Sequence, residues 1–153
     1  MTYRITGLSK EPYAHLFDLD DDQLAEVGAA RVTAETDRGW TCRVSLEEAK
    51  AGEKLLLVNH VSHDVMTPYR SAYAIYIRER ADQPAEYIDR TPPVFEGRTI
   101  SMRGFGADAM LRQVVMAEPG QHDSVIRNLF ADEGIAYIQA HNAAYGCFAA
   151  KVE

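Results

Sequence analysis

The sequence predicts one α+β domain over residues 1–153, in which about three short helices pack on one side of a mostly antiparallel, curved sheet. Segments with strand-like composition outnumber helix-like segments by nearly three to one. No repeat, low-complexity tract or linker divides the chain. With 46% hydrophobic residues, the chain is long enough to bury roughly two-thirds of its unfolded surface in one core.

The first helix is predicted from the residues that cap it. Asp20 and Gln23 have the spacing of a capping box, in which each side chain accepts a hydrogen bond from the other's backbone N–H. Gly28 stands where a helix ends most readily, because glycine adopts a positive φ without steric cost. Together these residues predict a helix over residues 21–27.

The same capping pattern recurs once. Ser45 and Glu48 have capping-box spacing and Gly52 follows as a stop, so a second helix is predicted over residues 46–51. A third helix is predicted over residues 123–131, where apolar residues recur at helical spacing after a Pro-Gly pair. Its apolar stripe is expected to lie across the sheet.

The remaining regular segments are rich in β-branched and aromatic residues, which is typical of strands. They cover residues 3–8, 31–35, 54–62, 72–79, 99–105, 111–117, 135–141 and 147–152. Between them, residues 63–68 and 80–96 form two long irregular connections. Long loops in small domains often carry binding elements, so both connections are candidates for contact with a ligand or partner.

The composition argues against several classes of protein. A formal net charge of −7 argues against a general nucleic-acid binder, because neutralising phosphates requires a dominant basic patch. The N-terminus lacks the apolar core of a signal peptide and no apolar run could span a membrane, so a cytoplasmic protein without membrane contact is expected. Cys42 and Cys147 lie far apart and are expected to be reduced thiols.

The C-terminal hairpin carries the densest set of reactive groups in the sequence. Its predicted strands, residues 135–140 and 147–152, are joined by a short turn. The turn brings the imidazole of His141, the amide of Asn142 and the thiol of Cys147 together. These groups are typical of metal ligation and nucleophilic catalysis. The sequence contains no phosphate-binding loop, dinucleotide glycine fingerprint, serine nucleophile elbow or calcium loop that would name a reaction.

Alternation sorts the residues of this hairpin onto two faces. If even-numbered positions pair with even-numbered positions, one face joins the core, and it carries Ala136, Ile138, Ala140, Phe148, Ala150 and Val152. The opposite face carries Gln139, His141 and Cys147 near the turn. A loop that is longer by one residue would break this pairing.

Alternation places further polar groups on one side of the sheet. Tyr76 and Arg78 share a face, and Arg103 lies on the polar face of its own strand. If these faces converge, they form a pocket with His141 and Asn142, and its arginines favour a carboxylate or phosphate. Further candidates for the wall of this pocket are Cys42, Arg43 and Cys147. The leading hypothesis is therefore binding of a small anionic molecule, and the alternative is a solvated sheet face with ordinary surface charges.

A second hypothesis is an enzyme that acts on a carbonyl or on another thiol. Cys147 would be the nucleophile, His141 its base and Asn142 the group that orients the histidine. Cys42 is a weaker candidate, because two glutamates follow it closely and would oppose a thiolate. The spacing matches no cysteine-hydrolase motif, and both cysteines could instead be small, buried and inert.

A metal site is also conceivable from the residue types. His60, His63 and Asp64, completed by His141 and a cysteine, would supply zinc ligands. The apolar run before His60 indicates a strand, however, and positions three apart on a strand point to opposite sides. We therefore predict no metal site and no cofactor.

A third functional hypothesis is a protein-interaction module. An exposed apolar strand edge or the loop over residues 87–95 would then contact a partner, and a homodimer formed through a strand edge is one form of this hypothesis. A broad apolar surface patch without a concave polar site would favour it.

Two segments are distinctive when taken together: Cys-Arg-Val-Ser-Leu at residues 42–46 and His-Asn-x-x-x-Gly-Cys at residues 141–147. With Pro-Tyr-Arg at 68–70, Ile-Tyr-Ile-Arg at 75–78 and Ser-Met-Arg at 101–103, they resemble the bacterial family called domain of unknown function 1203. The resemblance extends over almost the whole chain. It implies a stand-alone bacterial domain, and it implies no substrate, cofactor or catalytic residue because the family's function is unknown.

Overall fold

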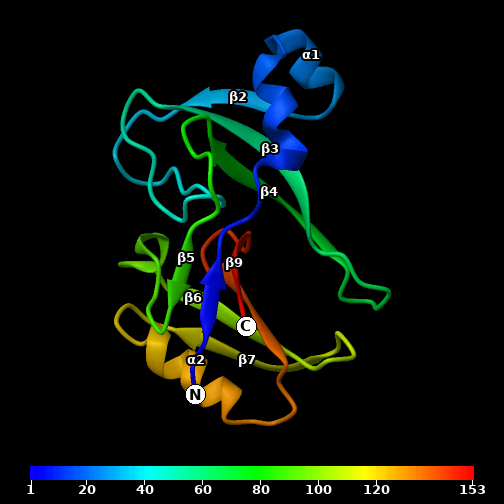
Figure 1. Ribbon diagram of the computed structural model, residues 1–153, viewed down its shortest axis with the longest axis vertical. Coiled ribbons are helices and arrows are strands. Elements are labelled where there is room, and N and C mark those ends of the chain that lie inside the picture. The colour runs from blue at the N-terminus through cyan, green and yellow to red at the C-terminus, as the bar shows by residue number, and fades with distance from the viewer.

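Two antiparallel β-sheets, one of six strands and one of three, follow each other along the long axis of the molecule (Figure 1). The computed structural model describes all 153 residues. In chain order the elements are β1 (Arg4–Thr6), the 3₁₀ helix η1 (Glu11–Asp18), α1 (Asp21–Glu26), β2 (Ala30–Thr33), β3 (Lys54–His63), β4 (Ser71–Arg78), β5 (Glu86–Ile88), the 3₁₀ turn η2 (Pro93–Phe95), β6 (Ile100–Phe105), β7 (Leu111–Ala117), α2 (His122–Phe130), β8 (Tyr137–Asn142) and β9 (Phe148–Val152). The predicted α+β class is confirmed, although the strands form two sheets. No helix is both long enough and apolar enough to cross a membrane.

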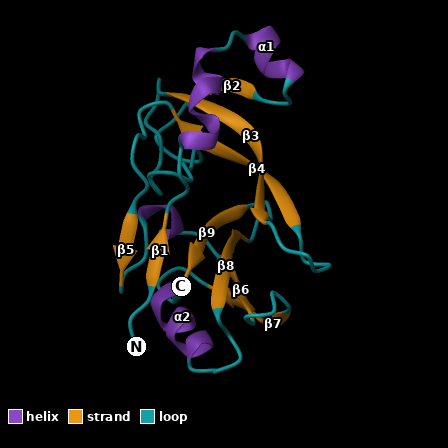
Figure 2. Ribbon diagram, turned by 45° about the vertical axis from the view of Figure 1, so that its right-hand side comes forward, coloured by secondary structure: helices purple, strands orange, loops and turns teal.

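The six-stranded sheet has the strand order β5-β1-β9-β8-β6-β7, and the three-stranded sheet has the order β2-β3-β4 (Figure 2). Because β1 pairs with β9, the two ends of the chain lie next to each other in the larger sheet. The C-terminal hairpin β8-β9 therefore occupies the centre of that sheet, where neighbouring strands hold its backbone on both sides.

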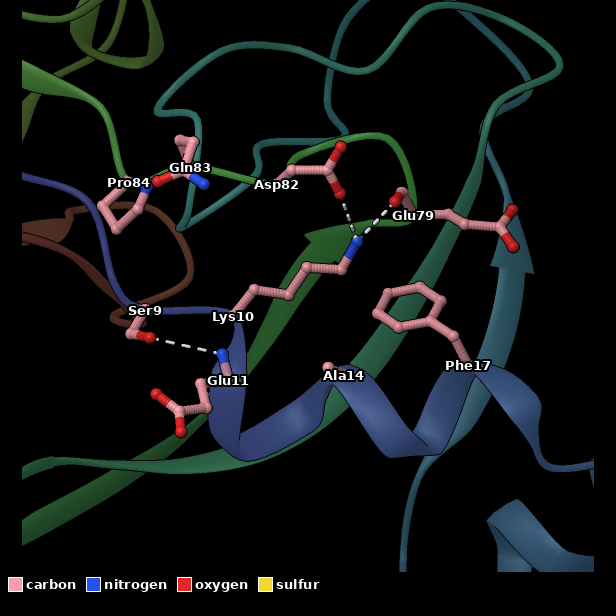
Figure 3. A pocket seen from close by; sticks show the side chains of 9 residues that line it. All are labelled: Ser9, Lys10, Glu11, Ala14, Phe17, Glu79, Asp82, Gln83 and Pro84. Carbon is pink, nitrogen blue, oxygen red and sulfur yellow. Dashed lines mark hydrogen bonds and ion pairs between the residues drawn. The ribbon is translucent and has the colours of Figure 1, made fainter.

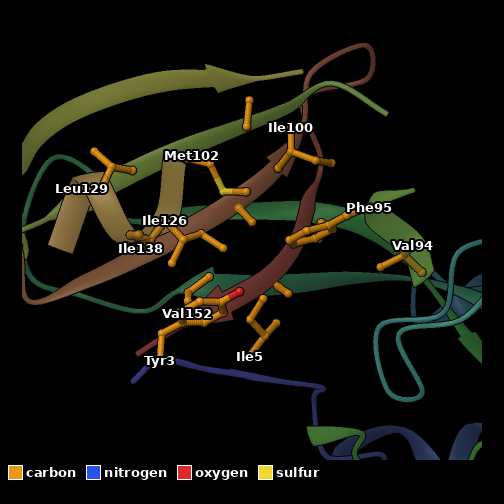
Figure 4. Close-up of a cluster of buried hydrophobic side chains, with 14 of the residues drawn as sticks. Tyr3, Ile5, Val94, Phe95, Ile100, Met102, Ile126, Leu129, Ile138 and Val152 are labelled. Atoms are coloured by element: carbon orange, nitrogen blue, oxygen red, sulfur yellow. The ribbon is translucent and has the colours of Figure 1, made fainter. Parts of the chain in front are cut away.

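The larger core lies between α2 and one face of the six-stranded sheet (Figure 4). Ile126 and Leu129 of α2 pack against this face, and each buried side chain of this size contributes roughly 1.5–3 kcal/mol of hydrophobic stabilisation. Val94 and Phe95 of η2 are buried in the same core. The apolar residues at the end of the loop over residues 87–95 are thus unavailable for the partner contact that the sequence suggested.

A second core lies between the three-stranded sheet and the two helices η1 and α1. Leu16 and Leu24 from these helices pack on Leu56 of β3 and Ile75 of β4. Alternation along β4 directs Ile75 and Ile77 toward this core.

The helix predicted over residues 21–27 is confirmed as α1. Asp20 Oδ1 accepts the N–H of Gln23 at 2.9 Å, and Gln23 Oε1 accepts the N–H of Asp20 at 3.0 Å, which completes the capping box. Gly28 adopts a φ of +72° directly after the helix. The helix predicted over residues 123–131 is confirmed as α2 with a shift of one residue at each end.

The helix predicted over residues 46–51 is wrong. This segment belongs to a tight turn in which Cys42 N donates to Glu47 O at 3.0 Å and Leu46 N donates to Cys42 O at 3.1 Å. Leu46 has a φ of +53°, which a helix cannot contain, and its side chain is fully buried in the larger core. Burial of this leucine stabilises the turn against the helical alternative.

Glu48, the residue expected to complete the second capping box, has other partners. Its carboxylate accepts the backbone N–H groups of Gly39 at 3.0 Å and Trp40 at 3.1 Å. It also pairs with the guanidinium of Arg98. These contacts hold the glutamate outside any helix and fix the loop that precedes the turn.

The register of the C-terminal hairpin agrees only in part with the predicted pairing. Ala140 pairs with Ala150 as expected, and both lie in the larger core. A β-bulge follows, so that His141 pairs with Phe148. Phe148 therefore lies beside the His141 ring, with 5.9 Å between centroids, and not in the larger core. Ala136 is exposed and precedes the strand.

The bulge results from the way in which the hairpin closes. Asn142 N donates to Cys147 O at 2.9 Å and Gly146 N donates to Asn142 O at 2.7 Å, so the turn sets Asn142 opposite Cys147. The register of Ala140 with Ala150 would instead set Asn142 opposite Phe148, so the turn shifts the pairing by one residue. The strands accommodate the extra residue as a β-bulge. Gly146 supplies the positive φ of +76° that this turn needs.

The second face of the larger sheet is covered near β8 by strand β3. Gln139 Nε2 donates to Ser62 O at 2.9 Å, and His63 Nε2 lies 2.7 Å from the hydroxyl of Tyr137. Gln139 is only 3% exposed. On β8 the polar face, which carries Gln139 and His141, is therefore an interior polar layer between the two sheets, and the alternative of a solvated sheet face is wrong for this strand.

Candidate functional site

Six of the eight predicted site residues line one of two neighbouring pockets, which share Tyr73. The arginine pocket has a volume of about 440 Å³, and the polar residues that line it include Arg70, Ser71, Tyr73, Ser101, Arg103 and His141. The thiol pocket has a volume of about 420 Å³, and the residues that line it include Arg43, Tyr73, Tyr76, Asn142, Tyr145 and Cys147. Both pockets lie where β8 and its neighbours approach β4.

Arg103 of β6 is a half-buried arginine without an ion pair. Its Nε donates to Ser101 Oγ at 3.4 Å and its Nη1 donates to the hydroxyl oxygen of Tyr73 at 3.4 Å. Both contacts are long and both acceptors are neutral. The guanidinium therefore retains donor capacity and an uncompensated positive charge toward the arginine pocket.

His141 provides a neutral ring nitrogen to the same pocket. Its Nδ1 lies 3.0 Å from Gly146 O, and because a carbonyl oxygen can only accept, Nδ1 carries the proton. The side chain is 2% exposed, and burial, aided by the charge of Arg103, lowers the pKa of His141 to about 4. The Nε2 lone pair is thus available at neutral pH, and Nε2 makes no hydrogen bond within the protein.

Arg43 is a buried arginine held between the two sheets. It is 4% exposed, and its Nε donates to Phe148 O at 2.7 Å. Its Nη1 donates to both oxygens of Thr41, and its Nη2 donates to Cys147 Sγ at 3.1 Å. Burial lowers the pKa of Arg43 and the neighbouring Cys147 sulfur opposes that shift. No carboxylate forms an ion pair with this guanidinium.

The thiol pocket also contains an amide with free donors. Asn142 Oδ1 accepts the backbone N–H of Ala144 at 3.3 Å, whereas its Nδ2 makes no hydrogen bond within the protein. Cys147 is a partly exposed free thiol at the same turn. Tyr76 forms part of the wall, and its ring packs at 5.4 Å against that of Trp40.

Arg78 is not part of either pocket, contrary to the prediction. It forms a two-point ion pair with Glu53, with Nε to Oε1 and Nη2 to Oε2 both at 2.9 Å. Its Nη1 donates to Ser45 at 3.2 Å and to Glu47 at 3.3 Å. Arg78 is the last residue of β4, whereas Tyr73, near the first residue of the strand, is the one that reaches Arg103. The carboxylates of Glu53 and Glu47 compensate the charge of Arg78, so it does not attract an anion as an unpaired arginine would.

Cys42 is likewise enclosed, and it is not a pocket residue. Its side chain is 0% exposed, and its Sγ accepts the backbone N–H groups of Arg78 at 3.3 Å, Val44 at 3.4 Å and Ser45 at 3.5 Å. The predicted inert role describes this cysteine well, because no reagent can approach its sulfur without local opening.

The structure does not place His141 and Cys147 in one pocket. The only side-chain hydrogen bond of His141 runs from Nδ1 to Gly146 O, and its ring lines the arginine pocket. Cys147 Sγ contacts Arg43 instead. The histidine is therefore not positioned as the base of this thiol.

Tyr73 and Ser101 are site residues that the sequence did not single out. Tyr73 shares its face of β4 with the apolar Ile75 and Ile77, yet its hydroxyl reaches Arg103 and its ring packs at 5.0 Å against His141. A signal for Ser101 was present, because it stands two residues before Arg103 and so shares its face of the strand.

The two remaining histidines between the sheets have local partners. His60 Nδ1 lies 2.6 Å from the hydroxyl of Tyr13, and His63 Nδ1 lies 2.8 Å from Tyr69 O. No group of three or more histidine, cysteine, aspartate or glutamate side chains is arranged to hold a metal ion. Each of these two imidazoles has a hydrogen-bond partner within the protein.

A third pocket, of about 450 Å³, lies between η1 and the end of β4 (Figure 3). Its one cation, Lys10, already donates from Nζ to Glu79 O at 2.5 Å and Asp82 Oδ1 at 3.3 Å. The carboxylates of Glu11, Glu79 and Asp82 outnumber this lysine. The pocket is thus unsuited to the anion that the sequence analysis anticipated.

The two distinctive sequence segments meet in this geometry, because Arg43 of the first contacts Cys147 of the second. The family model described as protein of unknown function (DUF1203) matches residues 39–153. The chain belongs to the DUF1203 family. The match includes every residue that lines the arginine and thiol pockets of this DUF1203 protein. Neither a curated protein nor a solved structure matches the chain.

Proposed function

We propose that this DUF1203 protein binds a small molecule bearing a carboxylate or phosphate group in the arginine pocket. The observation that carries the proposal is Arg103, a half-buried arginine with no ion pair that lines a concave site. Removing a guanidinium from water without a counterion is unfavourable, and an anionic ligand would supply the missing charge.

The other polar groups of the pocket can complete the recognition. The hydroxyl of Tyr73 accepts from Arg103, so its own proton is free to be donated to a ligand oxygen. His141 Nε2 can accept a hydrogen bond, which suits a ligand hydroxyl or a singly protonated phosphate beside the anionic oxygens. Arg70, exposed and paired with Asp64 at 3.1 Å, stands where a second anionic group could enter.

The size and charge of the protein favour a small ligand over a polymer. A volume of about 440 Å³ suits a metabolite-sized molecule. The net charge of −7 opposes approach of a nucleic acid, whereas one locally uncompensated arginine still attracts a small anion. Both cysteines are free thiols, which supports placing the protein in a reducing compartment such as the cytoplasm.

Replacement of Arg103 by methionine is expected to weaken anion binding at least about 10-fold, because a charge-assisted hydrogen bond contributes roughly 1.5–3 kcal/mol. Isothermal titration with inorganic phosphate, acetate and succinate would measure this, with the shift of the thermal midpoint as a second readout. Arg103→Lys retains the positive charge but lacks the planar guanidinium that can donate two parallel hydrogen bonds, so it should bind the anions with intermediate affinity.

Arg112→Met is the matched control for this experiment. Arg112 lies on the neighbouring strand β7 and pairs with Asp108 at 2.7 Å, outside the pocket. Its replacement should leave the affinity for phosphate, acetate and succinate unchanged. If Arg103→Met binds every probe as well as the natural protein does, the arginine pocket is not the anion site.

A further inference from the structure

The thiol pocket combines a sulfur with two sets of unused hydrogen-bond donors. A guanidinium has five N–H groups, and Arg43 uses four of them on Phe148 O, the two oxygens of Thr41 and Cys147 Sγ. One N–H of Nη2 therefore has no acceptor in the protein, directly beside the sulfur. Asn142 Nδ2 is equally without an acceptor in the same pocket. Both groups would hold an oxygen next to Cys147.

A buried positive charge lies directly beside the same sulfur. Arg43 is 4% exposed and has no carboxylate partner, and its Nη2 donates to Cys147 Sγ at 3.1 Å. Cys147 is partly exposed and lines the pocket, whereas Cys42 is fully buried. Only one of the two thiols is thus both bonded to an arginine side chain and accessible.

The lining of the thiol pocket restricts the chemistry that this thiol can support. Acyl transfer requires a base to activate water, and no histidine or carboxylate lines the pocket. Reaction with a hydroperoxide needs only the thiolate and donors for the departing oxygen. The pocket volume of about 420 Å³ can accommodate an organic substituent on that oxygen, and Leu57, Ala74 and Tyr76 would contact it.

We infer that the thiol pocket is a site of covalent modification, at which a hydroperoxide oxidises Cys147 to a sulfenic acid. Sγ attacks the terminal oxygen of the hydroperoxide, an S–O bond forms and the O–O bond breaks. The sulfur loses two electrons to the peroxide, and the departing alkoxide or hydroxide takes a proton from solvent to leave as an alcohol or water. The free N–H of Arg43 and the Nδ2 of Asn142 donate to the oxygens as charge develops.

Rates of sulfenic acid formation with hydrogen peroxide and tert-butyl hydroperoxide test this inference. The product would be trapped with dimedone and assigned by peptide mass spectrometry in the natural protein, Cys147→Ser and Cys42→Ser. We expect label on Cys147 alone, unaffected in Cys42→Ser, at a rate at least about 10-fold above that of the same cysteine in urea-unfolded protein. Equal rates in folded and unfolded protein would overturn the inference.

Two further variants separate the roles of the donors. Arg43→Lys should slow labelling at least about 10-fold, since it removes the planar guanidinium and its paired N–H donors beside the sulfur. Because this buried substitution could impair folding, Asn142→Leu at the half-buried turn provides an independent test and should slow labelling about 3- to 10-fold with an unchanged circular dichroism spectrum. A rate in Asn142→Leu equal to that of the natural protein would remove the amide from the mechanism. Arg112→Met, at a residue that lines neither pocket, should label normally and serves as the control.

Discussion

Replacement of Leu46 by alanine is expected to lower the free energy of unfolding by about 3 kcal/mol. The side chain is fully buried in the larger core, and truncation of a buried leucine removes hydrophobic contacts and leaves a cavity, at a cost of roughly 2–5 kcal/mol. A domain of this size has a total stability of about 5–15 kcal/mol, so the loss is a large fraction. Urea unfolding at neutral pH measures it, with an unchanged m-value as the check on two-state behaviour.

Leu46→Gly distinguishes the observed turn from the helix that the sequence pattern suggested. In a helix, glycine would be about 1 kcal/mol less stable than alanine. At the observed φ of +53° the order reverses, because glycine avoids a steric cost of about 1 kcal/mol that alanine retains. Val27→Ala, at an exposed position, should change stability by less than about 0.5 kcal/mol. A glycine variant clearly less stable than the alanine variant would contradict the turn.

The two predicted capping boxes show which parts of the fold were accessible from the sequence. Asp20 and Gln23 satisfy each other within one helical turn, so the local pattern sufficed to predict α1. Glu48 has the same local pattern but pairs with Arg98, far along the chain, and Leu46 is drawn into the larger core. These tertiary contacts outweighed the local preference for a capped helix, which amounts to about 1 kcal/mol.

The candidate site was predictable to the extent that it follows from strand alternation. Alternation placed Arg103 and His141 on polar faces that do converge, and it could not show that Arg78 lies in a different sheet with Glu53 as its partner. The contact between Arg43 and Cys147 joins residues from opposite parts of the sequence. Pairing across such distances is set by sheet topology, which short patterns do not encode.

The bulge in the C-terminal hairpin is a further feature that alternation could not supply. It depends on the turn closing with Asn142 opposite Cys147, and it moves Phe148 from the larger core to the polar layer. One inserted residue changes which side chains face His141. Six of the eight predicted residues do line a pocket, whereas their partition between two pockets was not predictable.

Acidification from pH 7 to pH 4 is expected to destabilise the fold by about 3 kcal/mol through His141 alone. Its pKa falls from 6.5 in the unfolded chain to about 4 in the folded protein, and each unit corresponds to about 1.4 kcal/mol. Between these values the unfolded chain binds a proton that the folded protein does not, so stability declines as the pH falls. Burial lowers the pKa of His60 as well, which adds a loss of the same sign.

His141→Asn isolates the contribution of this histidine. The asparagine amide does not titrate and can still donate to Gly146 O, as His141 Nδ1 does. Urea midpoints measured from pH 7 to pH 4 should fall less steeply in this variant, by an amount equivalent to about 3 kcal/mol over the range. His15→Asn, at an exposed position in η1, should retain the steep decline of the natural protein. Parallel pH profiles for the natural protein and His141→Asn would show that the imidazole is already solvated in the folded state. That result would also remove His141 as the buried, neutral hydrogen-bond acceptor of the arginine pocket.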